Sequence, residues 1–114
     1  MQVDQLARIA AQASSEKLGE NTLLIDVGEV IGITEYFVIT TGNNRRHIKS
    51  IIEGIEEELS SKADSKPICI EGKESSGWVL MDYGAFVVHV FDHQCRTFYD
   101  LERLWSDRPK ASWD

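Results

Sequence analysis

The segment that decides the fold runs from Trp78 to Phe91 and reads WVLMDYGAFVVHVF. Apolar and β-branched residues dominate it, and Gly84-Ala85 interrupts it, as in two strands joined by a short turn. Because successive side chains of a strand point to opposite faces, a two-residue turn pairs Tyr83 with Phe86 and fixes the register of every other pair. The sequence therefore predicts a β-hairpin.

The two faces of this hairpin differ in chemistry. One face carries only apolar and aromatic side chains: Val79, Met81, Tyr83, Phe86, Val88 and Val90. The other mixes large apolar groups with a carboxylate and an imidazole: Trp78, Leu80, Asp82, Val87, His89 and Phe91. Because unpaired buried polar groups cost several kcal/mol, we expect the first face to lie in the core. The second is either a recognition surface with aromatic anchors or another buried face in which Asp82 and His89 satisfy each other.

Helices and strands are predicted on both sides of the hairpin. Isoleucines and a leucine recur at helical spacing from Ile48 to Leu59, after a possible cap at Asn43 or Asn44. The other predicted elements are a helix at 3–18, strands at 23–27, 36–41 and 67–72, and a helix at 94–105. The order α-β-β-α-β-β-β-α predicts an α/β (α+β) fold, with a mixed sheet of about five strands and flanking helices. We expect one domain over 1–108 and a frayed tail over 109–114.

Composition favours a protein of the cytoplasm with a protein partner. The chain has 19 acidic and 12 basic residues and a net charge of −7, which disfavours free nucleic acid as a partner and favours a basic protein surface. No apolar run approaches the roughly 20 residues of a membrane span, and no signal peptide is visible. Cys69 and Cys95 belong to no C-x-x-C motif, so we expect reduced thiols.

The sequence gives only weak signals for a metal site, a catalytic nucleophile or an anion-binding site. His89, His93 and Cys95 are close in sequence, but a zinc site needs more ligands, and a Cys-His pair needs an orienting group. The Gly42-Asn43-Asn44 turn, with Arg45, Arg46 and Lys49, would suit an anion, although these cations also fit a solvated helix face. We expect no catalytic residue, no metal and no cofactor.

Three motifs resemble those of the ribosomal silencing factor (Iojap) family. They are YFVITTG at 36–42, WVLMDYG at 78–84 followed by VVHVF at 87–91, and YDLERLW at 99–105. The similarity extends from about Leu6 to Pro109, with all three motifs in the family order. One departure is Ala85, where family members often carry an acidic residue.

The resemblance implies a translational repressor. Members of the family bind the large ribosomal subunit at its intersubunit face, through the large-subunit protein numbered fourteen. They block joining of the small subunit and lower translation when nutrients are scarce. An assembly factor for the large subunit at the same site is an alternative, and the sequence leaves a homodimer open. Together with the hairpin geometry, the resemblance gives the expected partner-binding residues: Trp78, Leu80, Asp82, His89, Phe91, Tyr99, Glu102 and Trp105.

The resemblance also implies a nucleotidyltransferase-like fold and hence a second alternative, a nucleotide-handling enzyme. Those enzymes carry Gly-Ser at the start of a helix and Asp-x-Asp on a following strand. Here Gly42 is followed by Asn43, and the strand after the helix offers only Glu71. Because two-metal transfer needs several carboxylates, we expect the scaffold to lack a catalytic site.

Overall fold

The computed structural model describes residues 2–28 and 32–113, which form one mixed five-stranded sheet with helices on both faces. The order of strands across the sheet is β1-β2-β5-β4-β3. Strands β2 and β5 run parallel, and the other neighbours run antiparallel. The bounds are β1 (Glu20–Asp26), β2 (Tyr36–Thr41), β3 (Cys69–Glu71), β4 (Trp78–Asp82) and β5 (Phe86–Phe91). The predicted mixed sheet is confirmed.

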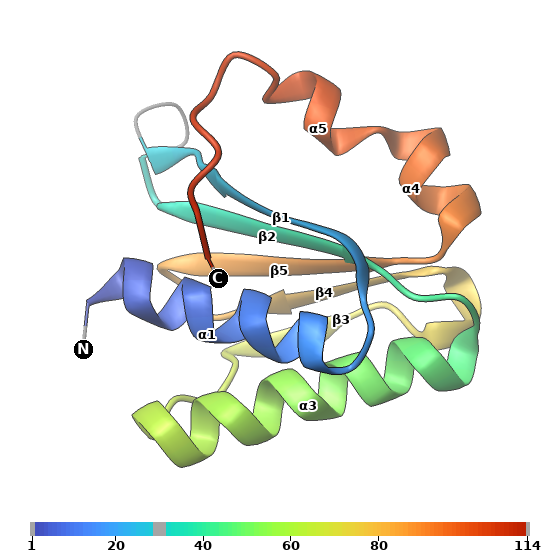
Figure 1. Cartoon of the computed structure of the whole chain (residues 1–114), viewed down its shortest axis with the longest axis horizontal. Coiled ribbons are helices and arrows are strands. Elements are labelled where there is room, and N and C mark those ends of the chain that lie inside the picture. Colours follow the sequence, from blue (N-terminus) through green and yellow to red (C-terminus); the bar gives the residue numbers. More distant parts are fainter. Residues whose placement is uncertain (1, 29–31, 114) are drawn as a thin grey trace.

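Two helices cover each face of the sheet (Figure 1). Helices α1 (Val3–Glu16) and α3 (Arg45–Ala63) lie on one face, which we call the inner face. Helices α4 (His93–Tyr99) and α5 (Leu101–Leu104) lie on the other, the outer face. A short 3₁₀ helix, η1 (Glu74–Ser76), connects β3 to β4. Among the described residues no helix has the length and apolar character needed to cross a membrane.

The inner face holds the main core. The Asn44 side chain caps α3 by accepting from the His47 N–H at 2.9 Å, which settles the choice between Asn43 and Asn44. The apolar stripe of α3 then packs on the hairpin and on α1, whose buried positions are mostly alanines that allow close approach. The core comprises Ala7, Ala10, Ala11, Ala13, Leu24, Val38, Ile48, Ile51, Ile52, Ile55, Leu59, Val79, Met81, Phe86, Val88 and Val90.

The predicted hairpin register is confirmed. Trp78 lies opposite Phe91, and the Tyr83 N–H donates to the Phe86 carbonyl at 3.0 Å. Gly84 adopts φ +85°, a left-handed conformation that glycine takes without a steric penalty, so it closes the turn. The apolar hairpin face is the inner face, where only Tyr83 stays partly accessible.

The last predicted helix is broken in two. Asp100 adopts φ 47° and ψ 52°, a left-handed conformation that ends α4 and redirects the chain into α5. Aspartate tolerates this conformation better than most residues because its short side chain can bond locally. The prediction of one continuous helix over 94–105 is therefore wrong.

The predicted frayed tail is also wrong for residues 109–113, and Asp114 lies outside the described residues. The Asp26 N–H donates to the Pro109 carbonyl at 3.0 Å, and the Ala111 N–H donates to the Leu24 carbonyl at 2.8 Å. The Trp113 indole N–H donates to the Thr22 carbonyl. The tail is ordered because it pairs with the otherwise open edge of β1, whose backbone groups need partners.

Candidate functional site

Helices α4 and α5 cover only part of the outer face. On β5, Val87, His89 and Phe91 are buried, with 9%, 4% and 0% of their surface exposed. On β4 the outward side chains of Trp78, Leu80 and Asp82 are only half-buried, and on β3 Cys69 and Glu71 are exposed. The register places Glu71 beside Leu80 and Cys69 beside Asp82. We call this uncovered set, Cys69, Glu71, Trp78, Leu80 and Asp82, the β3–β4 strip.

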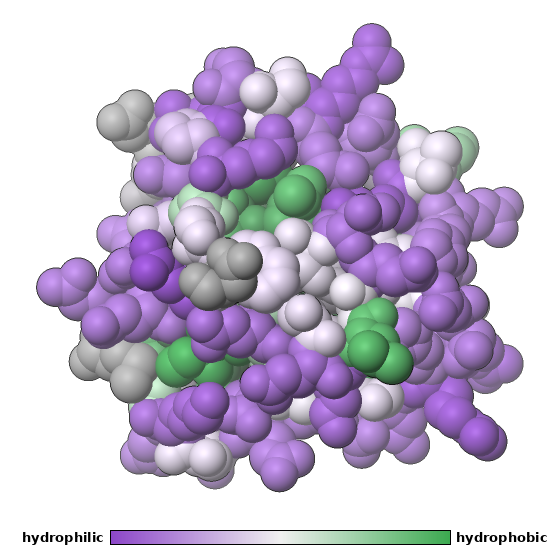
Figure 2. All heavy atoms as spheres, in the orientation of Figure 1, coloured by the Kyte–Doolittle hydropathy of each residue, from purple (hydrophilic) through white to green (hydrophobic). Residues whose placement is uncertain are grey.

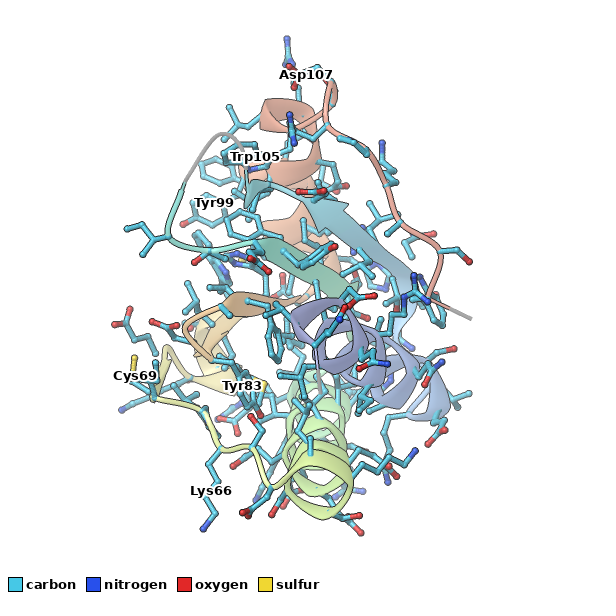
Figure 3. The ribbon with its side chains drawn as sticks, turned by 90° about the vertical axis from the view of Figure 1, so that its left-hand side faces the viewer. Lys66, Cys69, Tyr83, Tyr99, Trp105 and Asp107 are labelled. Carbon is cyan, nitrogen blue, oxygen red and sulfur yellow. The ribbon has the colours of Figure 1, made fainter. Side chains whose placement is uncertain are left out.

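Aromatic rings mark the border between the covered and uncovered parts. The Trp78 ring stacks on Phe91, with centroids 5.0 Å apart, and contacts Tyr99 at 4.6 Å. Trp105 meets Phe37 edge-on at 5.6 Å. Figure 3 shows Tyr99 and Trp105 by the α4–α5 layer and Cys69 farther away, near the β3 edge. Trp78 therefore links the buried cluster to the β3–β4 strip.

His89 positions Trp78 and carries no charge at neutral pH. The Trp78 indole N–H donates to Nδ1 of His89 at 3.2 Å, which assigns the ring proton to Nε2. Nε2 is buried and has no hydrogen-bond partner among the described residues. Burial lowers the pKa of His89 from 6.5 to about 4. A partner protein cannot reach this imidazole directly, so its contribution to docking goes through Trp78.

Asp82 and His89 do not satisfy each other, contrary to the alternative considered for this face. Oδ1 of Asp82 accepts from the Gly84 N–H at 2.7 Å, which supports the hairpin turn. The imidazole bonds to Trp78 instead. Asp82 remains half-buried on the strip, so its carboxylate lies where a partner can contact it.

Glu102 is already paired within the molecule. Its Oε1 accepts from Nε of Arg96 at 3.1 Å, and the same guanidinium donates to Oγ1 of Thr41 at 2.8 Å and to the Asn21 carbonyl at 2.7 Å. The Arg96 side chain is 10% exposed. This network ties α4 and α5 to the ends of β1 and β2, so Glu102 has a structural role that the sequence did not reveal.

The eight predicted partner-binding residues therefore separate into two groups. Trp78, Leu80, Asp82 and Tyr99 lie together and are at least partly accessible. His89 and Phe91 are buried, and Glu102 and Trp105 hold α5 in place. Sequence reasoning missed Cys69 and Glu71, because strand alternation at 67–72 does not tell which strand lies beside it. With them the strip includes a hollow of ≈220 Å³, lined by Glu71, Gly72, Trp78 and Leu80.

The candidates for metal or nucleophilic chemistry are bonded elsewhere. Nε2 of His93 lies 2.8 Å from both Oε2 of Glu20 and Oδ1 of Asn43. Burial raises the pKa of the Cys95 thiol, and Asp92 raises it further, which opposes a reactive thiolate. Within residues 2–28 and 32–113, no three His, Cys, Asp or Glu side chains gather as a metal site would require. At the start of α3, the Asn43 N–H donates to Nδ1 of His47, while Arg45, Arg46 and Lys49 stay solvated or partly so.

Comparisons with known proteins agree with the motifs and the fold. The model of a family described as ribosomal silencing factor during starvation matches residues 1–114. The ribosomal silencing factor RsfS of Bacillus subtilis is 35% identical and is aligned over 100% of this chain and 96% of its own length. A mouse protein, mitochondrial assembly of ribosomal large subunit protein 1, is 30% identical over 93% of this chain and 46% of its own.

A solved structure gives the same result for the fold. The crystal structure of a Chromobacterium violaceum protein superposes with a TM-score of 0.87 at 27% identity, covering 93% of this chain and 88% of that one. The family match extends over all three motifs and the whole β3–β4 strip. This chain therefore belongs to the ribosomal silencing factor family, a family of regulatory proteins rather than enzymes.

Proposed function

We propose that this protein binds the large ribosomal subunit at its intersubunit face, through the large-subunit protein numbered fourteen, and blocks joining of the small subunit. Membership of the silencing family supports the ribosome as the target. The name of the mouse relative supports the large subunit, and it also supports a second candidate function, assembly of that subunit. The resemblance in the three motifs supports the particular partner protein.

The uncovered β3–β4 strip is the observation that carries this proposal. It presents an indole and a leucine side chain beside two carboxylates, and Tyr99, which is 46% exposed, extends it toward α4. Protein interfaces favour this arrangement, in which aromatic anchors lie among polar groups that fix orientation. His89 supports it from below by holding the Trp78 indole in one orientation before a partner arrives.

Charge favours a basic partner. The chain carries a net charge of −7, and Glu71 and Asp82 place two carboxylates on the strip. Opposite charge on a partner raises the rate of encounter and selects the docking register. A basic ribosomal protein meets this requirement, whereas bulk RNA is repelled except at local cationic spots.

The mechanism is occupancy and needs no catalysis. A standard protein interface takes roughly 800 Å² from each partner, a small part of the 6450 Å² surface of this molecule. The bound protein, which measures 33 × 31 × 25 Å, then projects from the surface of the large subunit. A second subunit cannot approach the same surface while the protein is bound.

The test compares two leucines changed to the same residue. Leu80 lies on the strip, whereas Leu18 is 78% exposed just after α1, which packs on the inner face. We expect Leu80→Lys to lose cosedimentation with purified large subunits and to stop inhibiting subunit joining, while Leu18→Lys behaves as the unchanged protein. If Leu80→Lys cosediments and inhibits subunit joining as well as Leu18→Lys does, the docking surface is not the β3–β4 strip. If the unchanged protein binds but does not inhibit joining, the assembly function is favoured.

A further inference from the structure

The two edges of the sheet are treated differently. The edge of β1 is covered by the C-terminal segment, which crosses it in Figure 1, and Figure 2 shows that this side of the molecule is mostly hydrophilic. At the opposite edge, β3 has a strand neighbour only on its β4 side. Residues 68–73 are all exposed. The β3 edge therefore remains open in the part of the chain that the structure describes.

The backbone of β3 has unpaired groups along this edge. The Ile68 N–H donates inward to the Asp82 carbonyl at 2.7 Å. On β4 the odd residues pair with β5, since the Tyr83 N–H donates to the Phe86 carbonyl and the Asp92 N–H to the Gly77 carbonyl, so Leu80 and Asp82 direct their N–H and C=O groups toward β3. Their partners Glu71 and Cys69 therefore pair inward, and Ile70 between them directs its N–H and C=O groups outward. A free donor and acceptor on one residue of an open edge can exchange two hydrogen bonds with another extended chain.

A groove lies beneath the edge, between β3 and α3. One part has a volume of ≈540 Å³ and is lined by Glu53, Glu56, Glu57, Ser60, Ser65, Lys66 and Pro67. A second part of ≈290 Å³ shares Glu53 and Glu56 and adds Ile52, Ile70 and Val79. Ile68 and Ile70 are 72% and 41% exposed, and Ile70, which lies opposite Met81, belongs to the inner face of the strand. The groove thus offers exposed apolar contacts next to acidic side chains.

The negative charge of the groove favours a basic binding partner over a second copy of this chain. Its two parts are lined by four different carboxylates, Glu53, Glu56, Glu57 and Glu74, against the two ammonium groups of Lys49 and Lys66. A second copy of this chain would bring the same carboxylates, and another −7 of net charge, to the contact. Like charges at an interface oppose association, whereas a basic segment is attracted.

We propose that the open edge of β3 and the groove beneath it bind an extended, basic segment of a partner protein, which pairs with β3 as an added strand. Every second side chain of that segment faces α3, where lysine or arginine meets Glu53, Glu56 and Glu57. The methylene stems of these residues cover Ile68 and Ile70. This site lies on the inner side of the sheet, so it is separate from the β3–β4 strip and does not require that the strip binds the ribosome.

Synthetic peptides of about eight residues test the backbone and charge requirements separately. Fluorescence anisotropy with the full chain should show saturable binding of an alternating Lys-Val peptide and none of an alternating Glu-Val peptide. Two further Lys-Val peptides carry N-methyl groups on all lysines or on all valines. Because one edge of the peptide must pair with β3, one methylated peptide should fail and the other should bind. Binding of both as tightly as the unmodified peptide would overturn strand addition.

Two pairs of charge-reversal variants test whether the peptide binds in the groove beneath β3. Glu53→Lys with Glu57→Lys should raise the dissociation constant for the Lys-Val peptide by at least about tenfold, because attraction becomes repulsion. Glu35→Lys with Asp107→Lys makes the same charge change at exposed positions elsewhere, and Figure 3 shows Asp107 at the opposite end of the molecule from Lys66. Equal weakening by both pairs would overturn the proposed location, as would dimerisation of the chain through this edge in analytical ultracentrifugation. Leu80→Lys should leave peptide affinity unchanged, which separates this site from the ribosome-binding proposal.

Discussion

The imidazole of His89 on β5 contacts an aromatic side chain from each neighbouring strand: Phe37 of β2 lies edge-on at 4.7 Å, and the Trp78 indole of β4 donates to Nδ1. Burial lowers the pKa of His89 from 6.5 to about 4. The unfolded chain therefore binds a proton near pH 6.5, while the folded chain does so only near pH 4. Since the unfolded state holds more protons in this window, folding stability must fall as the pH falls through it.

The size and pH range of this effect can be measured. A pKa shift of this size corresponds to about 3 kcal/mol of the free energy of unfolding. This contribution is fully present above pH 6.5 and is lost as the pH falls to about 4. Urea unfolding across this range should show a steeper loss of stability in the unchanged protein than in His89→Phe, which has no group to titrate. Carboxylates titrate in both proteins, so the difference between the two curves reports His89. Parallel curves would mean that His89 is not held neutral by burial.

At the scale of single elements, the hairpin has a core face and, on the opposite side of the same strands, the face that we propose binds the large subunit. Val88 is fully buried on the inner face, whereas Trp78 lies at the border of the β3–β4 strip. Val88→Ala should lower the free energy of unfolding by on the order of 2 kcal/mol and leave the affinity of the folded protein for the large subunit unchanged. Trp78→Ala should weaken that affinity by on the order of 2 kcal/mol.

Both quantities must be measured for each hairpin variant, because Trp78 also packs on Phe91 and Tyr99. Thermal unfolding gives the stability, and titration of purified large subunits at a temperature where the variant is folded gives the affinity. A loss of affinity in folded Val88→Ala, together with normal affinity in Trp78→Ala, would mean that docking does not use the outer face.

Helices α4 and α5 are short, and the largely buried guanidinium of Arg96 adds hydrogen bonds to the aromatic contacts that hold them on the sheet. Arg96 bonds to Glu102, Thr41 and Asn21. Arg96→Ala removes three bonds and leaves Glu102 unpaired, which should cost about 3 kcal/mol. Arg103 lies exposed on α5, so Arg103→Ala is the matched control and should change stability by less than about 0.5 kcal/mol. Differential scanning calorimetry measures the melting temperature of both variants. Similar melting temperatures for Arg96→Ala and Arg103→Ala would disprove this role of Arg96.

The elements that could be predicted from the sequence are those fixed by local patterns. Strand alternation and Gly84 determined the hairpin register, and the spacing of isoleucines determined α3. The break at Asp100 was not predicted, because the pattern of residues 94–105 does not show that Asp100 takes a left-handed conformation. The bonds of Arg96 to Glu102 and to the distant Asn21 are likewise invisible in the local sequence. The same limit applies to the site: alternation placed Trp78 and Asp82 on one face, but it could not show that α4 buries Phe91 and leaves Leu80 accessible.

At the scale of the whole molecule, coverage of the sheet determines what remains available for partners. The C-terminal segment closes the β1 edge, and α4 and α5 close the outer face over β1, β2 and β5. The accessible remainder is the β3–β4 strip on one side of the sheet and the β3 edge with its groove on the other. The C-terminal segment, α4 and α5 thus restrict the sheet surface that a partner can reach.

Site-specific photo-crosslinking to purified large subunits shows which surface of the protein lies against the ribosome. A photoreactive amino acid replaces Leu80 on the strip in one variant and Leu18 beyond α1 in the other, and mass spectrometry identifies the attached ribosomal protein. We expect position 80 to crosslink to the large-subunit protein numbered fourteen and position 18 not to crosslink to it. Crosslinking of that protein from position 18 alone, or of a different protein from position 80, would contradict docking through the β3–β4 strip.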